Sequence, residues 1–292
     1  MEFSRACSHI RLVAIGLLVA VLSACANEAL LLPLNWREQD THVVTTTDLA
    51  YGTDARQTLD LYRLQGAQQA PVMVFWYGGS WQQGSKDYYR FVGQSLARRG
   101  FVAILPDYRL APDHPFPAFV EDAASAVRWA LDHAEEFGGD VNRIYISGHS
   151  AGGHSALMLA LDPRYLDAVG LAPSDLAGVV SLAGPTGLEN LRGEALKGVF
   201  PRAIPDDAFS PVTLAARHAK MAPPILLMIG LDDTVIYASS VARLADAVRA
   251  DGGSVTIKAY PGIGHIGLIL GFAAPFEGSS RTAVDLARFA GL

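Results

Sequence analysis

The sequence contains only two cysteines, at positions 7 and 25, so disulfides are not expected to hold the folded domain together. Its formal net charge is −6 and its lysines and arginines form no cluster, which disfavours nucleic-acid binding because that binding depends on neutralising phosphates. No spacing of histidine, cysteine and carboxylate residues is typical of a metal site, and no phosphate loop or dinucleotide fingerprint is present. We therefore predict neither a metal nor another cofactor.

The sequence does contain ample apolar material for a core. Of its 292 residues, 50% are hydrophobic, 18% charged and 9% aromatic, which is typical of a globular protein and not of a disordered chain. A chain of this length can bury a large core without disulfides or metals. Length alone allows one large domain or a pair of small ones.

The N-terminal residues have the pattern of an export signal. Arg5 and Arg11 precede an uninterrupted apolar stretch over residues 12–22, and small residues follow. The stretch is too short to span a bilayer comfortably, for which about 20 apolar residues are needed. Its ending, Leu-Ser-Ala-Cys, resembles the bacterial lipobox, in which cleavage precedes a cysteine that carries lipid. We expect a lipoprotein-type signal peptide over residues 1–24, lipid attachment at Cys25, and an exported protein anchored to the membrane of the cell envelope.

The alternatives for this N-terminal segment are an ordinary cleaved signal and a short uncleaved anchor. After the signal, we expect an N-terminal tether over residues 25–42 and a single α/β domain over residues 43–292. Segments 43–47 and 59–62 contain β-branched or alternating residues, which predict half-exposed, antiparallel strands. The later strands are predicted from continuous apolar runs at residues 72–76, 101–105, 144–146, 179–182 and 225–229.

Predicted helices separate these strands. Apolar residues recur at helical spacing over residues 88–99, 119–137, 240–250 and 283–289, and a last strand is predicted over residues 255–260. Alternation of this kind indicates crossover units and a doubly wound, mostly parallel sheet with helices on both faces. The long interval over residues 184–224 holds several prolines, and we predict that it forms a lid or a pocket wall over the strand ends.

A serine lies in a glycine-rich segment directly after the predicted strand 144–146. The segment has the sequence Gly-His-Ser-Ala-Gly-Gly over residues 148–153, and a predicted helix follows it. In the pattern Gly-x-Ser-x-Gly, the glycines permit a sharp turn, and the serine Oγ is exposed in a strained conformation at the strand end. The start of the helix favours developing negative charge. This context predicts that Ser150 is a nucleophile rather than part of a plain structural turn.

A serine hydroxyl needs a base, and the base needs an acid that orients it. In a sheet of this kind, the acid and then the histidine are expected on loops after later strands. His265 is the only histidine after the predicted strand 225–229, and it lies among glycines just after the last strand. The loop after strand 225–229 offers the adjacent Asp232 and Asp233 as acids, of which only one can reach the imidazole.

Charge that develops on a substrate carbonyl oxygen needs preorganised N–H donors. The N–H of Ala151, the residue after the nucleophile, is one candidate. The loop after the predicted strand 72–76 contains Gly78 and Gly79 followed by Ser80, and consecutive glycines allow backbone N–H groups to approach a substrate closely. We predict that Gly79, Ser80 and Ala151 form an oxyanion hole.

The sequence resembles the α/β-hydrolases over essentially the whole chain after the signal. Within that superfamily, residues 107–112 (Asp-Tyr-Arg-Leu-Ala-Pro) and the glycine-rich segment 148–153 are similar to segments of the hormone-sensitive-lipase-like carboxylesterases. The resemblance implies an α/β-hydrolase fold. It also implies that the acid is the last residue of a Gly-x-x-Asp loop, which is Asp233, and it places the oxyanion donors at the positions given above.

The oxyanion loop departs from that family. Tyr77 stands where the family has histidine and Ser80 where it has a third glycine, although backbone donors survive both changes. Trp81 matches the pattern His-Gly-Gly-x-Trp of kynurenine formamidases, and isoprenylcysteine methylesterases are further relatives to consider. Because little chain precedes the predicted sheet, we do not expect the helical cap that is common in the lipase-like group.

Together these residues predict a carboxylesterase that forms an acyl-enzyme on Ser150, with His265 as base and Asp233 as acid, acting on a small-molecule ester. An amidase or arylformamidase with the same triad is the alternative among enzymes. A catalytically silent envelope protein that binds ligands on an inherited fold is the alternative from another class.

Overall fold

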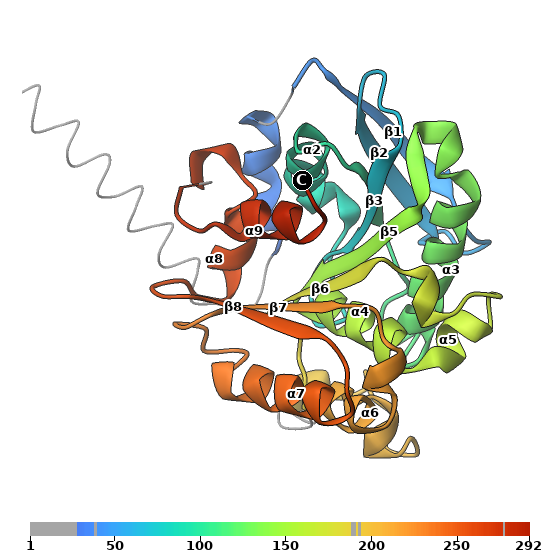
Figure 1. Cartoon of the computed structure of the whole chain (residues 1–292), viewed down its shortest axis with the longest axis vertical. Helices are drawn as coiled ribbons and strands as arrows, with labels where there is room; N and C mark the ends of the chain where they lie inside the picture. The colour runs from blue at the N-terminus through green and yellow to red at the C-terminus, as the bar shows by residue number, and fades with distance from the viewer. Residues whose placement is uncertain (1–27, 38–39, 188–190, 192–193, 277) are drawn as a thin grey trace, which may run out of the picture.

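An eight-stranded sheet with helices on both of its faces forms the centre of the protein (Figure 1). The computed structural model describes residues 28–37, 40–187, 191, 194–276 and 278–292. The predicted signal peptide over residues 1–24 and the predicted lipid-attachment residue Cys25 lie outside the described residues. In the described part of the chain, no helix is long and apolar enough to cross a bilayer.

The strands follow the order β1-β2-β4-β3-β5-β6-β7-β8 across the sheet. Strand β2 is antiparallel to both β1 and β4, whereas all other neighbouring strands are parallel. The prediction of a doubly wound, mostly parallel sheet is therefore confirmed. The strands are β1 Val43–Ala50, β2 Thr58–Leu64, β3 Ala70–Trp76, β4 Val102–Pro106, β5 Gly139–His149, β6 Gly178–Leu182, β7 Ile225–Gly230 and β8 Val255–Tyr260.

The central strands are buried on both faces, as their continuous apolar sequences predict. Every residue of β3, β4, β6 and β7 is buried. The edge strand β1, in contrast, has no buried residue and is half-exposed, as predicted. The carboxyl ends of the parallel strands meet at one edge of the sheet, and the candidate site lies there.

Strand β2 is antiparallel, as predicted, but it is more buried than its alternating sequence predicts, so the prediction that residues 59–62 are half-exposed is wrong. Asp60 is fully buried, which is costly for a carboxylate without partners. Lys86 Nζ lies 2.8 Å from Asp60 Oδ1, and the backbone N–H of Asp48 donates to the same oxygen over 3.0 Å. Because these partners satisfy the carboxylate, Asp60 lies inside the protein and not in solvent.

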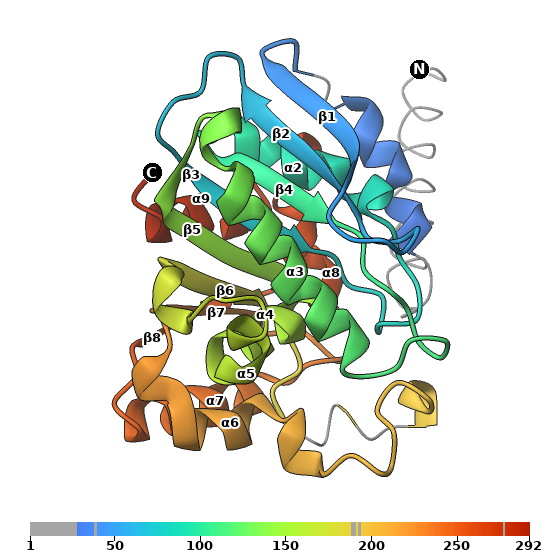
Figure 2. The ribbon, with the colours of Figure 1, turned by 90° about the vertical axis from the view of Figure 1, so that its right-hand side faces the viewer.

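Helices α3, α4 and α7 cover one face of the sheet, and α2, α8 and α9 cover the other (Figure 1, Figure 2). Helix α3 buries its predicted apolar stripe but ends at His133, earlier than predicted, and a 3-10 turn over Glu135–Phe137 leads on towards β5. The helices are α2 Arg90–Arg98, α3 Ala118–His133, α4 Ala151–Leu161, α5 Pro163–Asp167, α6 Pro211–His218, α7 Ala238–Ala250, α8 His265–Leu270 and α9 Thr282–Phe289.

Within the predicted N-terminal tether, residues 28–37 form a 3-10 helix, η1 Glu28–Arg37. Leu31 in this segment is buried. Asn35 Nδ2 donates to the carbonyl oxygen of Asp87 over 2.8 Å, and Asn35 Oδ1 accepts from the N–H of Phe91 over 3.0 Å. This part of the segment therefore packs against the start of α2.

The predicted lid insertion, residues 184–224, contains α6 and short 3-10 turns. Phe200 and Phe209 within it are buried. The ring centroid of Phe200 lies 5.0 Å from that of Trp81, and Nε2 of His154 donates to the carbonyl oxygen of Phe209 over 2.9 Å. These contacts fix the described part of the insertion against the loop after β3 and against α4. Its function as a lid stays a prediction.

Candidate active site

Ser150 lies between the end of β5 and the start of α4, in a strained backbone conformation. Its φ of 52° and ψ of −118° are rare for a residue with a side chain, and such strain costs on the order of 1–3 kcal/mol. The N–H of Ser150 donates to the carbonyl oxygen of Leu182 over 2.9 Å, and its own carbonyl accepts from the N–H of His154 over 3.0 Å. The backbone of Ser150 is thus fixed on both sides, while its side chain is partly exposed.

The glycines on either side of Ser150 leave no space for a side chain. A Cβ atom on Gly148 would lie 2.3 Å from the carbonyl carbon of Gly152. A Cβ atom on Gly152 would lie 2.2 Å from the carbonyl oxygen of Trp76 and 2.6 Å from that of Tyr77. Because both positions are glycine, the turn can close and the start of α4 can approach the loop that follows β3.

The acid and the base predicted from the sequence meet at the ends of β7 and β8. His265 Nδ1 lies 2.8 Å from Asp233 Oδ2, and Asp233 is buried whereas its neighbour Asp232 is exposed. The N–H of Asp232 donates to the carbonyl oxygen of Ile263 over 3.0 Å. A Cβ atom on Gly230 would lie 2.1 Å from that same oxygen, so glycine permits this close approach of the two loops.

Hydrogen bonds hold the Asp233 carboxylate in its ionised form. Burial alone would raise the pKa of Asp233, but the hydrogen bond and charge of His265 and the N–H groups of Ile236 and Val235 outweigh it and lower the pKa. Asp233 Oδ1 accepts from Val235 over 2.8 Å and from Ile236 over 2.9 Å. Its Oδ2 is left for the Nδ1–H of His265, and this tautomer leaves Nε2 of the imidazole as a proton acceptor.

His149, the residue before Ser150, joins the turn at Ser150 to the loop of His265. The ring centroids of His149 and His265 lie 4.8 Å apart, and His149 Nε2 donates to the carbonyl oxygen of His265 over 3.1 Å. Burial lowers the pKa of His149 to about 3, so its ring stays neutral. The sequence does not predict this contact, and the position of His149 beside Ser150 is the only signal for it in the sequence.

The predicted oxyanion donors lie on the loop after β3 and at the start of α4. Gly79, Ser80 and Trp81 have φ angles of 112°, 55° and 59°, and the last two are strained because they carry side chains. Within the described residues, the N–H groups of Gly79, Ser80 and Ala151 make no hydrogen bond. Unpaired N–H groups on a loop held in one conformation are what an oxyanion hole requires.

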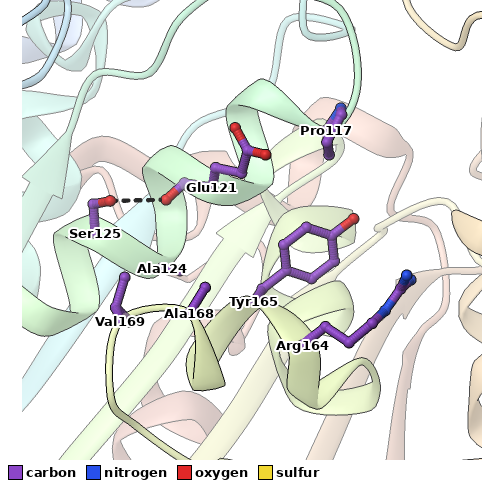
Figure 3. Close-up of a pocket in the computed structure, with 8 residues that line it drawn as sticks. All are labelled: Pro117, Glu121, Ala124, Ser125, Arg164, Tyr165, Ala168 and Val169. Carbon is purple, nitrogen blue, oxygen red and sulfur yellow. Dashed lines mark hydrogen bonds between the residues drawn. The ribbon is translucent and has the colours of Figure 1, made fainter.

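A hollow on the surface lies between α3 and α5, away from these residues (Figure 3). Its volume is about 350 Å³, and its lining includes Glu121, Arg164 and Tyr165. None of the predicted site residues lines it, so it is separate from the candidate site. Among the described residues, no group of three or more His, Cys, Asp or Glu side chains could hold a metal ion.

The architecture and the site together define the class of protein. The sheet has the strand order and the single antiparallel β2 of an α/β-hydrolase, with Ser150 after β5, Asp233 after β7 and His265 at the end of the loop after β8. The chain belongs to the BD-FAE family, whose model matches residues 59–247. The α/β-hydrolase fold implied by the sequence is therefore confirmed.

Curated proteins with similar sequences include several esterases. The chain is 31% identical to esterase LipC of Mycobacterium tuberculosis over 233 residues, which cover 74% of this chain and 58% of LipC. It is 29% identical over 244 residues to a probable isoprenylcysteine α-carbonyl methylesterase of Arabidopsis thaliana, covering 76% of this chain and 51% of the relative. Carboxylesterase NlhH of M. tuberculosis is 29% identical, with 75% of this chain and 73% of NlhH covered. The chain thus spans little more than half the length of the first two relatives.

Solved structures with the same fold are also esterases by name. Inhibited esterase B from Lactobacillus rhamnosis superposes with a TM-score of 0.76 and 20% identity, covering 96% of this chain and 95% of that structure. A truncated carbohydrate esterase from gut microbiota superposes with a TM-score of 0.73 and 20% identity, covering 87% of this chain and 97% of that structure. At this level of identity, the likeness establishes the fold.

Proposed function

We propose that this protein is a carboxylesterase that hydrolyses small-molecule esters through Ser150, His265 and Asp233. The observation that carries the proposal is the 2.8 Å hydrogen bond between His265 Nδ1 and Asp233 Oδ2. The contact of His265 with His149, the residue before Ser150, supports the assignment of this pair to Ser150. The esterase names of the curated relatives support the same reaction class.

In the acylation step, Ser150 Oγ attacks the carbonyl carbon of the ester and His265 Nε2 accepts the hydroxyl proton. The carbonyl electron pair moves to oxygen, where the N–H groups of Gly79, Ser80 and Ala151 stabilise the negative charge. Asp233 stabilises the imidazolium that forms. When the tetrahedral intermediate collapses, the bond to the alcohol oxygen breaks and that oxygen takes the proton from His265.

In the deacylation step, water replaces the alcohol and attacks the acyl-enzyme carbonyl carbon. His265 Nε2 accepts a proton from that water and later gives it to Ser150 Oγ as the ester bond to the serine breaks. The products are a carboxylic acid and the regenerated enzyme. Neither step needs a metal or an organic cofactor.

A comparison of two substrates tests this reaction class. We expect the purified protein to have a higher kcat/KM for p-nitrophenyl acetate than for N-formylkynurenine. The ester carbonyl of the first compound is more reactive than the amide carbonyl of the second. The reverse ranking would favour an arylformamidase, the alternative with the same triad. Hydrolysis of neither compound, together with no labelling by a fluorophosphonate, would favour a silent binding protein of the envelope.

We also propose that the protein is exported and anchored to a bacterial membrane by lipid on Cys25. Arg5 and Arg11 before the apolar residues 12–22, and the lipobox-like ending, support this proposal. We expect Cys25→Ser to abolish incorporation of an alkyne-labelled fatty acid and to release the protein from the membrane fraction. Cys7→Ser is the matched control and should keep both properties. Undiminished labelling of the Cys25→Ser protein would contradict the proposal.

A further inference from the structure

Tyr77, at the start of the loop that carries Gly79 and Ser80, is held by a buried hydrogen-bond network. The residue is 1% exposed. The Tyr77 hydroxyl donates to Asp107 Oδ1 over 2.8 Å and accepts from Arg56 Nη2 over 2.7 Å. Burial raises the pKa of Tyr77 well above its ordinary value, so the hydroxyl keeps the proton that it donates.

The same network reaches Gly84, at the far end of the loop that begins with Tyr77. Arg56 Nη2 also donates to the carbonyl oxygen of Gly84 over 3.0 Å, and Arg56 Nε donates to that of Tyr108 over 2.8 Å. A Cβ atom on Gly84 would lie 2.5 Å from Cε2 of Tyr77, so the Tyr77 ring fills the space beneath that residue. Arg56 and Tyr77 thus tie the two ends of the loop, residues 77–84, to each other.

Asp107 and Tyr108 fix the first residues of the loop from the other side. Asp107 Oδ1 accepts the N–H of Lys86 over 2.8 Å in addition to the Tyr77 hydroxyl. The Tyr108 hydroxyl lies 3.2 Å from the carbonyl oxygens of both Tyr77 and Gly78. The rings of Tyr77 and Tyr108 stack with centroids 4.7 Å apart. The residues just before the strained Gly79 and Ser80 therefore have little freedom to move.

We propose that Tyr77, with Arg56 and Asp107, is a positioning residue that holds the N–H groups of Gly79 and Ser80 in the geometry that stabilises an oxyanion. The inference rests on the proposed esterase function. Strained residues keep their conformation only when their surroundings fix it, and this network is what fixes both ends of the loop. Tyr77 therefore has a role of its own at the position where the hormone-sensitive-lipase-like relatives have histidine.

The Tyr77→Phe variant tests the inference because it removes the hydroxyl and keeps the ring. We expect kcat for p-nitrophenyl acetate to fall on the order of 10-fold to 100-fold, since displaced oxyanion donors lose transition-state stabilisation. KM should change little, because the donors act mainly on the charge that develops in the transition state. The inhibition constant of a methyl trifluoromethyl ketone should rise by about the same factor as kcat falls, because its serine adduct places an oxyanion in the hole.

Tyr62→Phe is the matched control. Tyr62 is also buried, and its hydroxyl donates to Asp60 Oδ2 over 3.3 Å on β2. Its loss should leave kcat and ketone inhibition unchanged, provided that the far-ultraviolet circular dichroism shows a folded protein. Arg56→Met is a second variant for the network in case Tyr77→Phe does not fold, because the Arg56 side chain is 34% exposed and its replacement is easier to accommodate.

Wild-type kcat and ketone inhibition in a folded Tyr77→Phe or Arg56→Met variant would overturn the inference. An equal loss in Tyr62→Phe would also overturn it, since any buried hydroxyl would then have the same effect. Failure of the proposed function is distinguishable from both results. In that case the wild-type protein itself would neither hydrolyse p-nitrophenyl acetate nor bind the ketone.

Discussion

Replacing Ser150 by alanine is expected to abolish ester hydrolysis and labelling by a fluorophosphonate. The expected loss of kcat is on the order of 10⁶-fold, as when a serine protease loses its nucleophile. The variant should fold, because the hydrogen bonds that fix residue 150 come from its backbone N–H and carbonyl groups, which alanine retains. Release of p-nitrophenol and gel fluorescence of the labelled protein measure the two effects.

Ser155→Ala is the matched control for this experiment. Ser155 lies on α4, which begins directly after Ser150; it is buried, and its hydroxyl lies 3.3 Å from the carbonyl oxygen of Ala151. Removing this hydroxyl should leave labelling intact and turnover close to the wild-type value. Near-normal turnover by Ser150→Ala would contradict the assignment of the nucleophile, and labelling of that variant would place the reactive group on another residue.

Most of the sheet can be predicted from the sequence because its central strands are continuous apolar runs. Strands β3 and β7 contain no charged side chain and are buried along their whole length. In a sheet that is covered on both faces, such runs avoid the cost of burying unpaired polar groups. The apolar sequence of these strands therefore indicates directly that they are buried on both faces of the sheet.

The burial of strand β2 could not be predicted in the same way. Asp60 interrupts its apolar residues and suggests an exposed face, but its partner Lys86 comes from η2 Lys86–Tyr89, which precedes α2. Lys86 is itself 3% exposed. An ion pair between segments so far apart in the chain leaves no local pattern, so the burial of both charges becomes visible only in the folded structure.

The approximate place of the candidate site follows from topology, since the carboxyl ends of parallel strands meet at one edge of the sheet. Ser150, Asp233 and His265 can each be placed there because each follows a predicted strand. The contacts between side chains cannot be obtained this way. The ring contact between His149 and His265, and the bonds of Tyr77 with Asp107 and Arg56, join residues whose separation in sequence gives no pattern.

Substitution of one of the two adjacent aspartates after β7 is expected to have the second large effect on kcat. Asp233→Asn should lower kcat on the order of 10³-fold or more, because the amide can offer its NH₂ group to His265 Nδ1 and so favour the tautomer with a proton on Nε2. That tautomer could not accept the proton of Ser150. The loss of the negative charge would also remove the stabilisation of the imidazolium.

Asp232→Asn is the matched control, since it removes the same charge from the neighbouring residue of the same loop. Asp232 is exposed, whereas Asp233 is buried and bonded to His265. Its substitution should therefore leave kcat within about twofold of the wild-type value, because exposed charges interact weakly through water. Asp233→Asn should remain folded, because its amide oxygen can still accept the N–H groups of Val235 and Ile236, which now bond to Oδ1. A larger loss of kcat in Asp232→Asn than in Asp233→Asn would reverse the assignment of the acid.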